Sequence, residues 1–168
     1  KNISYTRIKR TSSGTWALSN WLVSSVNLKN VQRAYERSMW GFWDREAGEK
    51  QRRNWRPFIR LFNRIEPFDH VVFQIARTGE MHAVATVRRT YFDDQTPIWD
   101  RELELNRVLY PWRVDLAVML YSEKPILKTF IRISDYVDGY GIGELPQHDL
   151  TNLLAAIATK TETKVKLS

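Results

Sequence analysis

The sequence predicts an α+β domain whose sheet curls into a small barrel with helices around it. Three observations predict this class. A strand and an amphipathic helix occupy residues 21–41, two β-rich runs flank a tight turn within residues 70–91, and a leucine-rich helix closes the domain over residues 146–159. Most strands follow one another as hairpins with a single early crossover, which favours a largely antiparallel sheet that bends on itself.

The opening unit, WLVSSVNLKNVQRAYERSMWG, predicts the element around which the domain is built. Residues 21–23 form a short apolar strand, a polar turn follows, and a helix begins with apolar positions at helical spacing. Asn27 is the expected N-cap of this helix, whose first-turn N–H groups have no partner within the helix. A bulky aromatic residue and a glycine, Trp40 and Gly41, follow the helix.

The same unit predicts a small polar and aromatic pocket. A strand end, a helix N-terminus with Asn30 in its first turn, and Trp40 returning from the far end of the helix suit a flat heterocycle. The ring would supply stacking, and the amide and the N–H groups would supply hydrogen bonds. In the alternative interpretation, Trp40 belongs to the core and Asn30 is a solvated helix residue.

The remaining segments are read from composition and periodicity. We expect an N-terminal arm or edge strand (1–15), a loop (42–52), a helix with Pro57 in its first turn (53–65), a hairpin (70–77 and 81–91), a loop (92–110), a strand (112–120), one or two strands (125–127 and 130–136), a closing helix (146–159) and a C-terminal linker (160–168). The binding domain is expected to span residues 16–159.

Composition limits the chemistry that is available. The 168 residues include no cysteine, which excludes disulfides, thiol catalysis and cysteine-ligated zinc. No signal peptide and no apolar run near the ~20 residues of a membrane span is visible. We therefore expect an intracellular protein, cytoplasmic in a prokaryote and nuclear or cytoplasmic in a eukaryote. Because the chain starts at Lys1, we also expect it to be a module of a longer chain with further domains.

The charge balance favours a polyanionic partner. Lys and Arg number 26 against 19 Asp and Glu, a net charge of +7, which points to nucleic acid first and to an anionic membrane second. Residues 45–64 are rich in arginine interleaved with Trp55, Phe58 and Phe62, which adds stacking surface to phosphate attraction. The alternative is an ordinary solvated face.

No catalytic apparatus is visible in the sequence. His70, His82 and His148 lie far apart and match no metal-ligand spacing, and there is no P-loop, dinucleotide-binding glycine motif or nucleophile elbow. We expect a binding module without a metal or other cofactor, not an enzyme.

Two further segments complete a family resemblance. Thr96-Pro97-Ile98-Trp99 is followed by Tyr110-Pro111-Trp112-Arg113-Val114. Together with the opening unit, an Asp-Gly turn at 138–139 and the late helix, these motifs resemble the YTH and EVE domains of the PUA-like superfamily over roughly residues 16–157. The resemblance implies a reader of modified bases, N6-methyladenine for YTH domains and modified DNA bases for several EVE-like domains.

The resemblance also implies roles for individual residues. Trp40 and Trp99 would be two walls of an aromatic cage, facing each other around the methylated edge of a flipped base. The Asn30 amide would donate to the neighbouring ring nitrogen, and the Gly41 carbonyl would accept the exocyclic N–H. Main-chain groups of the turn residues Ser25, Val26 and Asn27 would reach the far side of the ring. Leu103 or Leu105 is the expected floor of the cage.

Two departures from the YTH pattern bear on the expected partner. Ser24 replaces a lysine that often precedes the turn serine, and Val137 replaces an arginine that often holds a phosphate. The phosphate contacts are therefore assigned to Arg45, Arg52, Arg53, Arg88 and Arg89. The main expectation is a methylated-DNA reader that targets a McrB-type modification-dependent restriction system. The first alternative is a YTH-type reader of N6-methyladenosine in RNA, and the second is a basic structural or interaction domain without a base pocket.

Overall fold

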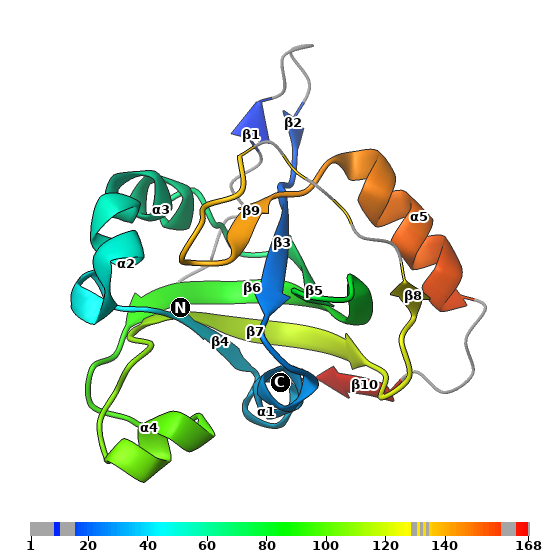
Figure 1. Ribbon diagram of the computed structural model, residues 1–168. Helices are drawn as coiled ribbons and strands as arrows, with labels where there is room; N and C mark the ends of the chain where they lie inside the picture. The colour runs from blue at the N-terminus through cyan, green and yellow to red at the C-terminus, as the bar shows by residue number, and fades with distance from the viewer. Residues whose placement is uncertain are drawn as a thin grey trace, which may run out of the picture.

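A curled mixed sheet with helices on both sides forms the body of the protein (Figure 1). The computed structural model describes residues 9–10, 16–128, 131, 133, 135–158 and 164–167. Within these residues the main sheet has the strand order β10-β7-β6-β5-β3-β9, with β4 paired to β7 and β8 paired to β6. The expected α+β class with a curled sheet is confirmed.

The opening unit folds largely as predicted. Strand β3 (Asn20–Ser25) leads into α1 (Leu28–Arg37), and β4 (Met39–Phe42) follows. The Asn27 side chain caps α1 by accepting a hydrogen bond from the backbone N–H of Asn30 at 2.9 Å. Ser38 ends the helix in the left-handed conformation (φ 57°), and this sharp change of direction carries the chain straight into β4.

The predicted hairpin is also confirmed. β5 (His70–Ile75) and β6 (Glu80–Phe92) pair antiparallel, and β7 (Trp112–Tyr121) continues the sheet from β6. β5 lies parallel to β3, which is the expected crossover. Asp69 joins the two parallel strands, because its buried carboxylate accepts hydrogen bonds from the Ser19 amide and the Trp21 indole.

Two predicted loops contain helices. Residues 42–52 include a 3₁₀ turn (Arg45–Ala47) and α2 (Glu49–Arg53), and α3 (Trp55–Phe62) covers the predicted 53–65 helix. The predicted loop 92–110 contains α4 (Asp100–Leu105). Neither missed helix shows an apolar period, since α2 buries no residue and α4 buries only the charged Glu102.

The C-terminal region corrects one prediction. α5 (Gln147–Ala158) confirms the closing helix, and β9 (Ile142–Glu144) precedes it. Residues 164–167, predicted as linker, form β10 (Lys164–Leu167), which pairs antiparallel with residues 118–121 of β7. The reason is that β4 pairs only with the first half of β7, so the second half has an edge that accepts another strand.

Three predictions concern short or partly described segments. β8 (Leu127–Lys128) lies at the predicted strand 125–127. Residues 131, 133, 135 and 136 are not in a strand, and the rest of the predicted strand 130–136 lies outside the described residues. In the predicted arm 1–15, only residues 9–10 are described. They form β1 (Lys9–Arg10), which pairs with β2 (Trp16–Ala17).

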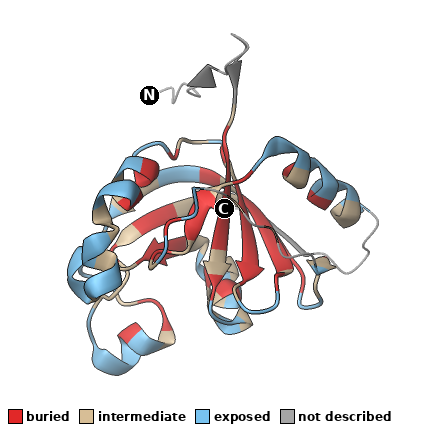
Figure 2. Cartoon of the chain, turned by 45° about the horizontal axis from the view of Figure 1, so that its top comes forward, coloured by how far each residue is buried: buried red, intermediate tan, exposed pale blue. Residues whose placement is uncertain are grey.

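The sheet is buried on both faces, as the red strands of Figure 2 show. Trp21 and Val23 of β3 pack into a large cluster with α1 and α3, and Leu22 between them packs with Leu153 of α5 on the opposite face. Burial on both faces explains why this strand reads as an uninterrupted apolar run.

The α5 face offers a test of this packing. Leu153 is fully buried and Leu154 is 39% exposed, so Leu153→Ala is expected to lower the free energy of unfolding by about 2–4 kcal/mol. Leu154→Ala, the matched control, is expected to change it by about 0.5 kcal/mol or less. Urea denaturation followed by circular dichroism measures both, and equal losses would contradict the assigned orientation of α5.

Candidate functional site

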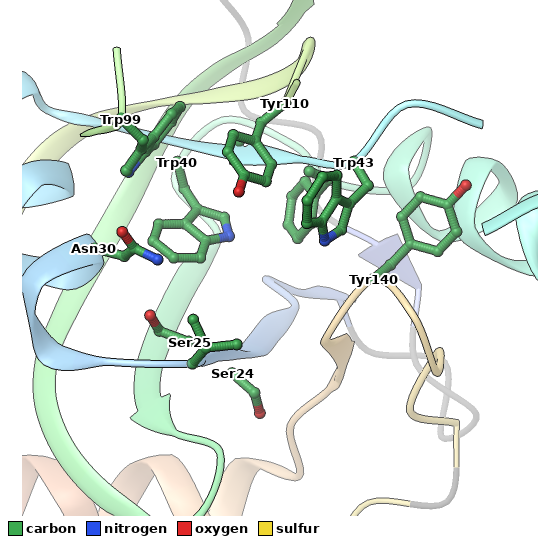
Figure 3. Close-up of a pocket in the computed structure, with 11 residues that line it drawn as sticks. Ser24, Ser25, Asn30, Trp40, Trp43, Trp99, Tyr110 and Tyr140 are labelled. Carbon is green, nitrogen blue, oxygen red and sulfur yellow. The ribbon is translucent and has the colours of Figure 1, made fainter. Parts of the chain in front are cut away.

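A pocket opens where β3 ends and α1 begins (Figure 3). It encloses about 90 Å³. A water molecule needs roughly 10–15 Å³ by this measure, so the pocket has room for roughly six to nine water-sized groups, of the order of one flat base. Its lining is polar on one side and aromatic on the other, and consists of Ser24, Ser25, Val26, Asn30, Trp40, Gly41, Phe42, Trp43, Trp99, Tyr110 and Tyr140.

Asn30 supplies the polar side of the pocket. The Asn27 cap holds the first turn of α1 in place and thereby sets the position of Asn30. Figure 3 shows the Asn30 amide directed at the space beside the Trp40 ring. Within the described residues this amide has no hydrogen-bond partner, so it is available to a ligand.

Trp40 and Trp99 form a corner instead of two facing walls. Their ring centroids lie 5.9 Å apart and their planes meet at 79°. Trp40 also meets Phe73 edge to face at 5.5 Å. The expected arrangement of two indoles facing across a slot is therefore wrong, because the two rings adopt the edge-to-face packing that aromatic pairs prefer. A base can lie flat against one indole while its edge meets the other.

The corner requires a glycine at position 41. A Cβ atom on Gly41 would lie 2.9 Å from Trp99 Cζ3 and 2.9 Å from Tyr110 Cβ, closer than side chains tolerate. The Gly41 backbone is also suitably placed. The backbone N–H of Leu116 donates to the Ser38 carbonyl. In an antiparallel pair the residues that bond to the partner strand alternate, so Trp40 and Phe42 direct their N–H and C=O groups at β7. The N–H and C=O groups of Gly41 therefore face the opposite edge of β4. Among the described strands only β7 pairs with β4, which leaves the Gly41 carbonyl at an open edge beside the pocket.

A buried carboxylate holds the two segments that carry Trp99 and Tyr110. One oxygen of Glu102 accepts hydrogen bonds from the Ile98 and Trp99 amides at 2.9 and 3.1 Å. Its other oxygen accepts from the Leu109 and Tyr110 amides at 2.8 and 3.1 Å. Glu102 is fully buried, and these four bonds replace much of the hydration it has lost.

Arg113 neutralises this carboxylate and extends the network. Its guanidinium lies 3.5 Å from Glu102 Oε2, donates to the Tyr110 and Thr96 carbonyls, and pairs with Asp93 at 3.2 Å. It also lies 5.8 Å from the centre of the Trp99 ring, within cation–π range. Arg113 is fully buried as well, so the network fixes both aromatic segments to β7.

Of the remaining residues predicted to bind the base, some line the pocket and others lie outside its lining. Val26 lines the pocket and is 74% exposed. Ser25 lines it too, but its hydroxyl donates to the Asn27 carbonyl at 2.7 Å, so its side chain is already used. Asn27 does not line the pocket and acts on it through the helix cap. Leu103 and Leu105 lie outside the lining and are exposed on α4, so neither is the floor of a cage.

The predicted phosphate-binding arginines fall into two groups. Arg45, Arg52 and Arg53 lie on the exposed segment that follows β4, close in the chain to the pocket residue Trp43. Arg88 and Arg89 lie on β6, which contributes no residue to the pocket lining, and Arg89 is paired with Asp115 at 2.8 Å.

Several lining residues were missed from the sequence: Ser24, Phe42, Trp43, Tyr110 and Tyr140. Ser24 and Tyr110 were named only as parts of motifs, and the other three were not singled out. A possible signal is their position, because most of these residues stand at the ends of elements, where ligand-facing side chains often lie. The signal is weak because the sequence does not show which of these helix and strand ends lie close together in space.

Within the described residues, no group of three or more His, Asp or Glu side chains is arranged to hold a metal ion. In the same part of the chain, none of the helices has the length and apolar character of a membrane span.

Comparison with known proteins places the chain in a family. It is 54% identical to the uncharacterized protein MJ1369 of Methanocaldococcus jannaschii over 143 residues, which is 85% of this chain and 92% of the relative. The chain belongs to the family of that archaeal protein. No family model matches the sequence.

Two solved structures define the fold. The chain resembles the Toxoplasma CPSF4 YTH domain, solved in complex with a 7-mer m6A-modified RNA, with a TM-score of 0.53 and 13% identity over 86% of this chain and 93% of that one. It resembles the Mmi1 YTH domain, solved in complex with RNA, with a TM-score of 0.50 and 12% identity over 90% of this chain and 85% of that one. The fold is therefore YTH-like.

The Glu102 network gives a prediction within this YTH-like fold. Glu102→Ala leaves Arg113 buried without its carboxylate and frees four amides, so the free energy of unfolding is expected to fall by about 3–5 kcal/mol. Glu104→Ala is the matched control on the exposed side of α4 and is expected to cost about 0.5 kcal/mol or less. Thermal and urea unfolding measure the difference, and similar stabilities of the two variants would refute the role assigned to Glu102.

The lining also predicts how binding responds to pH. Only Tyr110 and Tyr140 of the lining residues titrate. Burial, with the nearby Glu102 charge, raises the pKa of Tyr110, and burial, with the Asp44 charge, raises the pKa of Tyr140 to about 12. Both hydroxyls therefore stay neutral throughout pH 6–9. The affinity for an uncharged aromatic ligand of this pocket, measured by calorimetry, is expected to vary less than about twofold over this range. A steeper profile would show that a titrating group contacts the ligand.

Proposed function

We propose that the protein binds RNA that carries N6-methyladenine, with the methylated base inserted into the pocket between Asn30, Trp40 and Trp99. The observation that carries this proposal is the combination of an aromatic corner with an unpartnered amide in a pocket of single-base size. The two indoles of the corner provide a surface for stacking and for contact with a methyl group. The Asn30 amide provides a hydrogen bond that distinguishes one base from another.

The magnitudes are sufficient for a reader. Stacking a base on an aromatic side chain contributes about 1–3 kcal/mol, comparable to the few kcal/mol needed to unstack a base. A methyl group buried against an indole adds on the order of 1 kcal/mol, a preference of about five- to tenfold. A buried amide left unpaired by the wrong base costs about 1–3 kcal/mol.

RNA is favoured over the DNA-restriction interpretation. The two similar structures described above are YTH domains in complex with RNA, and in one of them the RNA is m6A-modified. These two structures give the DNA-restriction interpretation no such support. The net charge of +7 supplies attraction to either polyanion, with the strong salt dependence of phosphate binding.

The decisive experiment compares four single-stranded oligonucleotides of one sequence, methylated or unmethylated, as RNA or DNA. Fluorescence anisotropy at fixed salt is expected to show about fivefold or greater preference for methylated RNA over unmethylated RNA, and weaker binding of both DNAs. Equal affinity for methylated and unmethylated RNA would remove the reader function. Tighter binding of methylated DNA would restore the DNA interpretation.

Asn30 permits a test that spares the fold, whereas Trp40 and Trp99 are buried in the core. Asn30→Ala is expected to weaken binding of methylated RNA about 5- to 100-fold, because the ring nitrogen of the inserted base loses its donor. Gln32→Ala on the exposed face of the same helix is the matched control and is expected to bind like the wild type. Equal affinities of the two variants would exclude the Asn30 amide from recognition.

A further inference from the structure

The aromatic lining extends further than one base can cover. The pocket volume is of the order of one base, and Asn30, Trp40 and Trp99 already supply its hydrogen bond and its two walls. Figure 3 shows Trp43 and Tyr140 at the opposite end of the pocket, with Tyr110 between the two ends. A base inserted beside Asn30 stacks against Trp40 or Trp99, so the Trp43 ring is left for a different contact.

Of these rings, Trp43 offers the free stacking surface. Tyr140 is already used in packing, since it stacks on Phe58 at 3.9 Å with planes 6° apart and is only 5% exposed. Trp43 is partly buried, and the one ring that contacts it among the described residues is Tyr110, at 4.6 Å and 56°. Trp43 also packs against the hydrophobic core and lines the pocket, so the exposed part of its indole is the surface that remains for a second ring.

A cation stands beside this indole. Arg45 follows Trp43 by two residues, and its side chain is 57% exposed. Its guanidinium lies 6.0 Å from the centre of the Trp55 ring. The carboxylate that contacts it belongs to the exposed Glu46, at 3.9 Å, and Glu46 is shared with Arg52 at the same distance. Exposed pairs of this length are weak, so Arg45 is able to exchange Glu46 for a phosphate.

We propose that Trp43 is a stacking platform for a second base, that of the nucleotide adjacent to the inserted one, and that Arg45 binds the phosphate between the two. This inference rests on the proposed function and extends it from a single base to a dinucleotide step. Every base presents an aromatic face, so the platform tolerates any neighbouring base. Hydrogen bonds select the inserted base, whereas the neighbouring base adds to the affinity whichever base it is.

The experiment uses methylated RNA 5-mers with N6-methyladenosine at the centre. One 5-mer is intact, one has an abasic nucleotide immediately 5′ of the methylated residue, and one has it immediately 3′. We expect one of the two abasic RNAs to bind about 5- to 100-fold more weakly than the intact RNA, and the other to bind nearly as well. If both abasic RNAs bind like the intact one, the platform does not exist.

The variant Trp43→Ala tests whether the weaker binding of the abasic RNA is due to lost stacking on Trp43. It is expected to weaken the intact 5-mer by a similar factor and to remove the difference between the intact RNA and the sensitive abasic RNA. Phe92→Ala, which removes an exposed ring outside the pocket, is the control and is expected to retain that difference. Unfolding curves of both variants establish that they are folded.

Free N6-methyladenosine separates this inference from the proposed function. If Trp43→Ala weakens the free nucleoside as much as the 5-mer, Trp43 is a wall of the base pocket and the platform is refuted, while the reader function stands. If the wild type fails to discriminate methylated RNA, the proposed function fails and the platform fails with it.

Arg45 has its own measurement. Arg45→Gln is expected to lower the slope of log affinity against log salt by about 0.7, the value for one phosphate contact on a single strand. Arg77→Gln, an exposed arginine next to the β5–β6 turn, is the control and is expected to leave the slope unchanged. An unchanged slope for Arg45→Gln would show that the phosphate is bound elsewhere.

Discussion

The buried pair of Glu102 and Arg113 is the constraint on which the candidate site depends. A carboxylate and a guanidinium without exposure to solvent carry a large desolvation cost, which is offset only when every polar atom has a partner. Here the partners are the backbone groups of residues 98–99, 109–110 and 96. Satisfying the charges therefore imposes the path of two irregular segments, and those segments place Trp99 and Tyr110 against β4.

The second constraint is the approach of these rings to a strand. Gly41 leaves room for Trp99 and Tyr110 at distances that any side chain would prevent. Its neighbour Trp40 points into the core and packs on Phe73. The pocket wall is thus continuous with the hydrophobic core, which keeps the corner rigid, whereas its polar side depends on one helix cap at Asn27. A preformed pocket of this kind spends little binding energy on ordering itself.

Charge and recognition are separated in space. The pocket lining contains no charged side chain, while the arginines of residues 45–60 lie on the segment that follows β4 and are mostly exposed. This separation allows the basic surface to attract a polyanion without regard to sequence, and leaves selection to stacking and hydrogen bonds in a site of lower dielectric.

The sequence by itself determined the elements whose signals are local. The apolar run at residues 21–23, the Asn27 cap and the tight turn within residues 70–91 predicted β3, α1 and the hairpin. The order of the motifs predicted that Asn30, Trp40 and Trp99 are neighbours. Only the tertiary structure decided the perpendicular arrangement of the two indoles, the helix around Glu102, the pairing of residues 164–167 with β7, and the contributions of Trp43, Tyr110 and Tyr140. These features depend on contacts between residues far apart in the chain and on charges satisfied by backbone groups, and neither leaves a periodic pattern in the sequence.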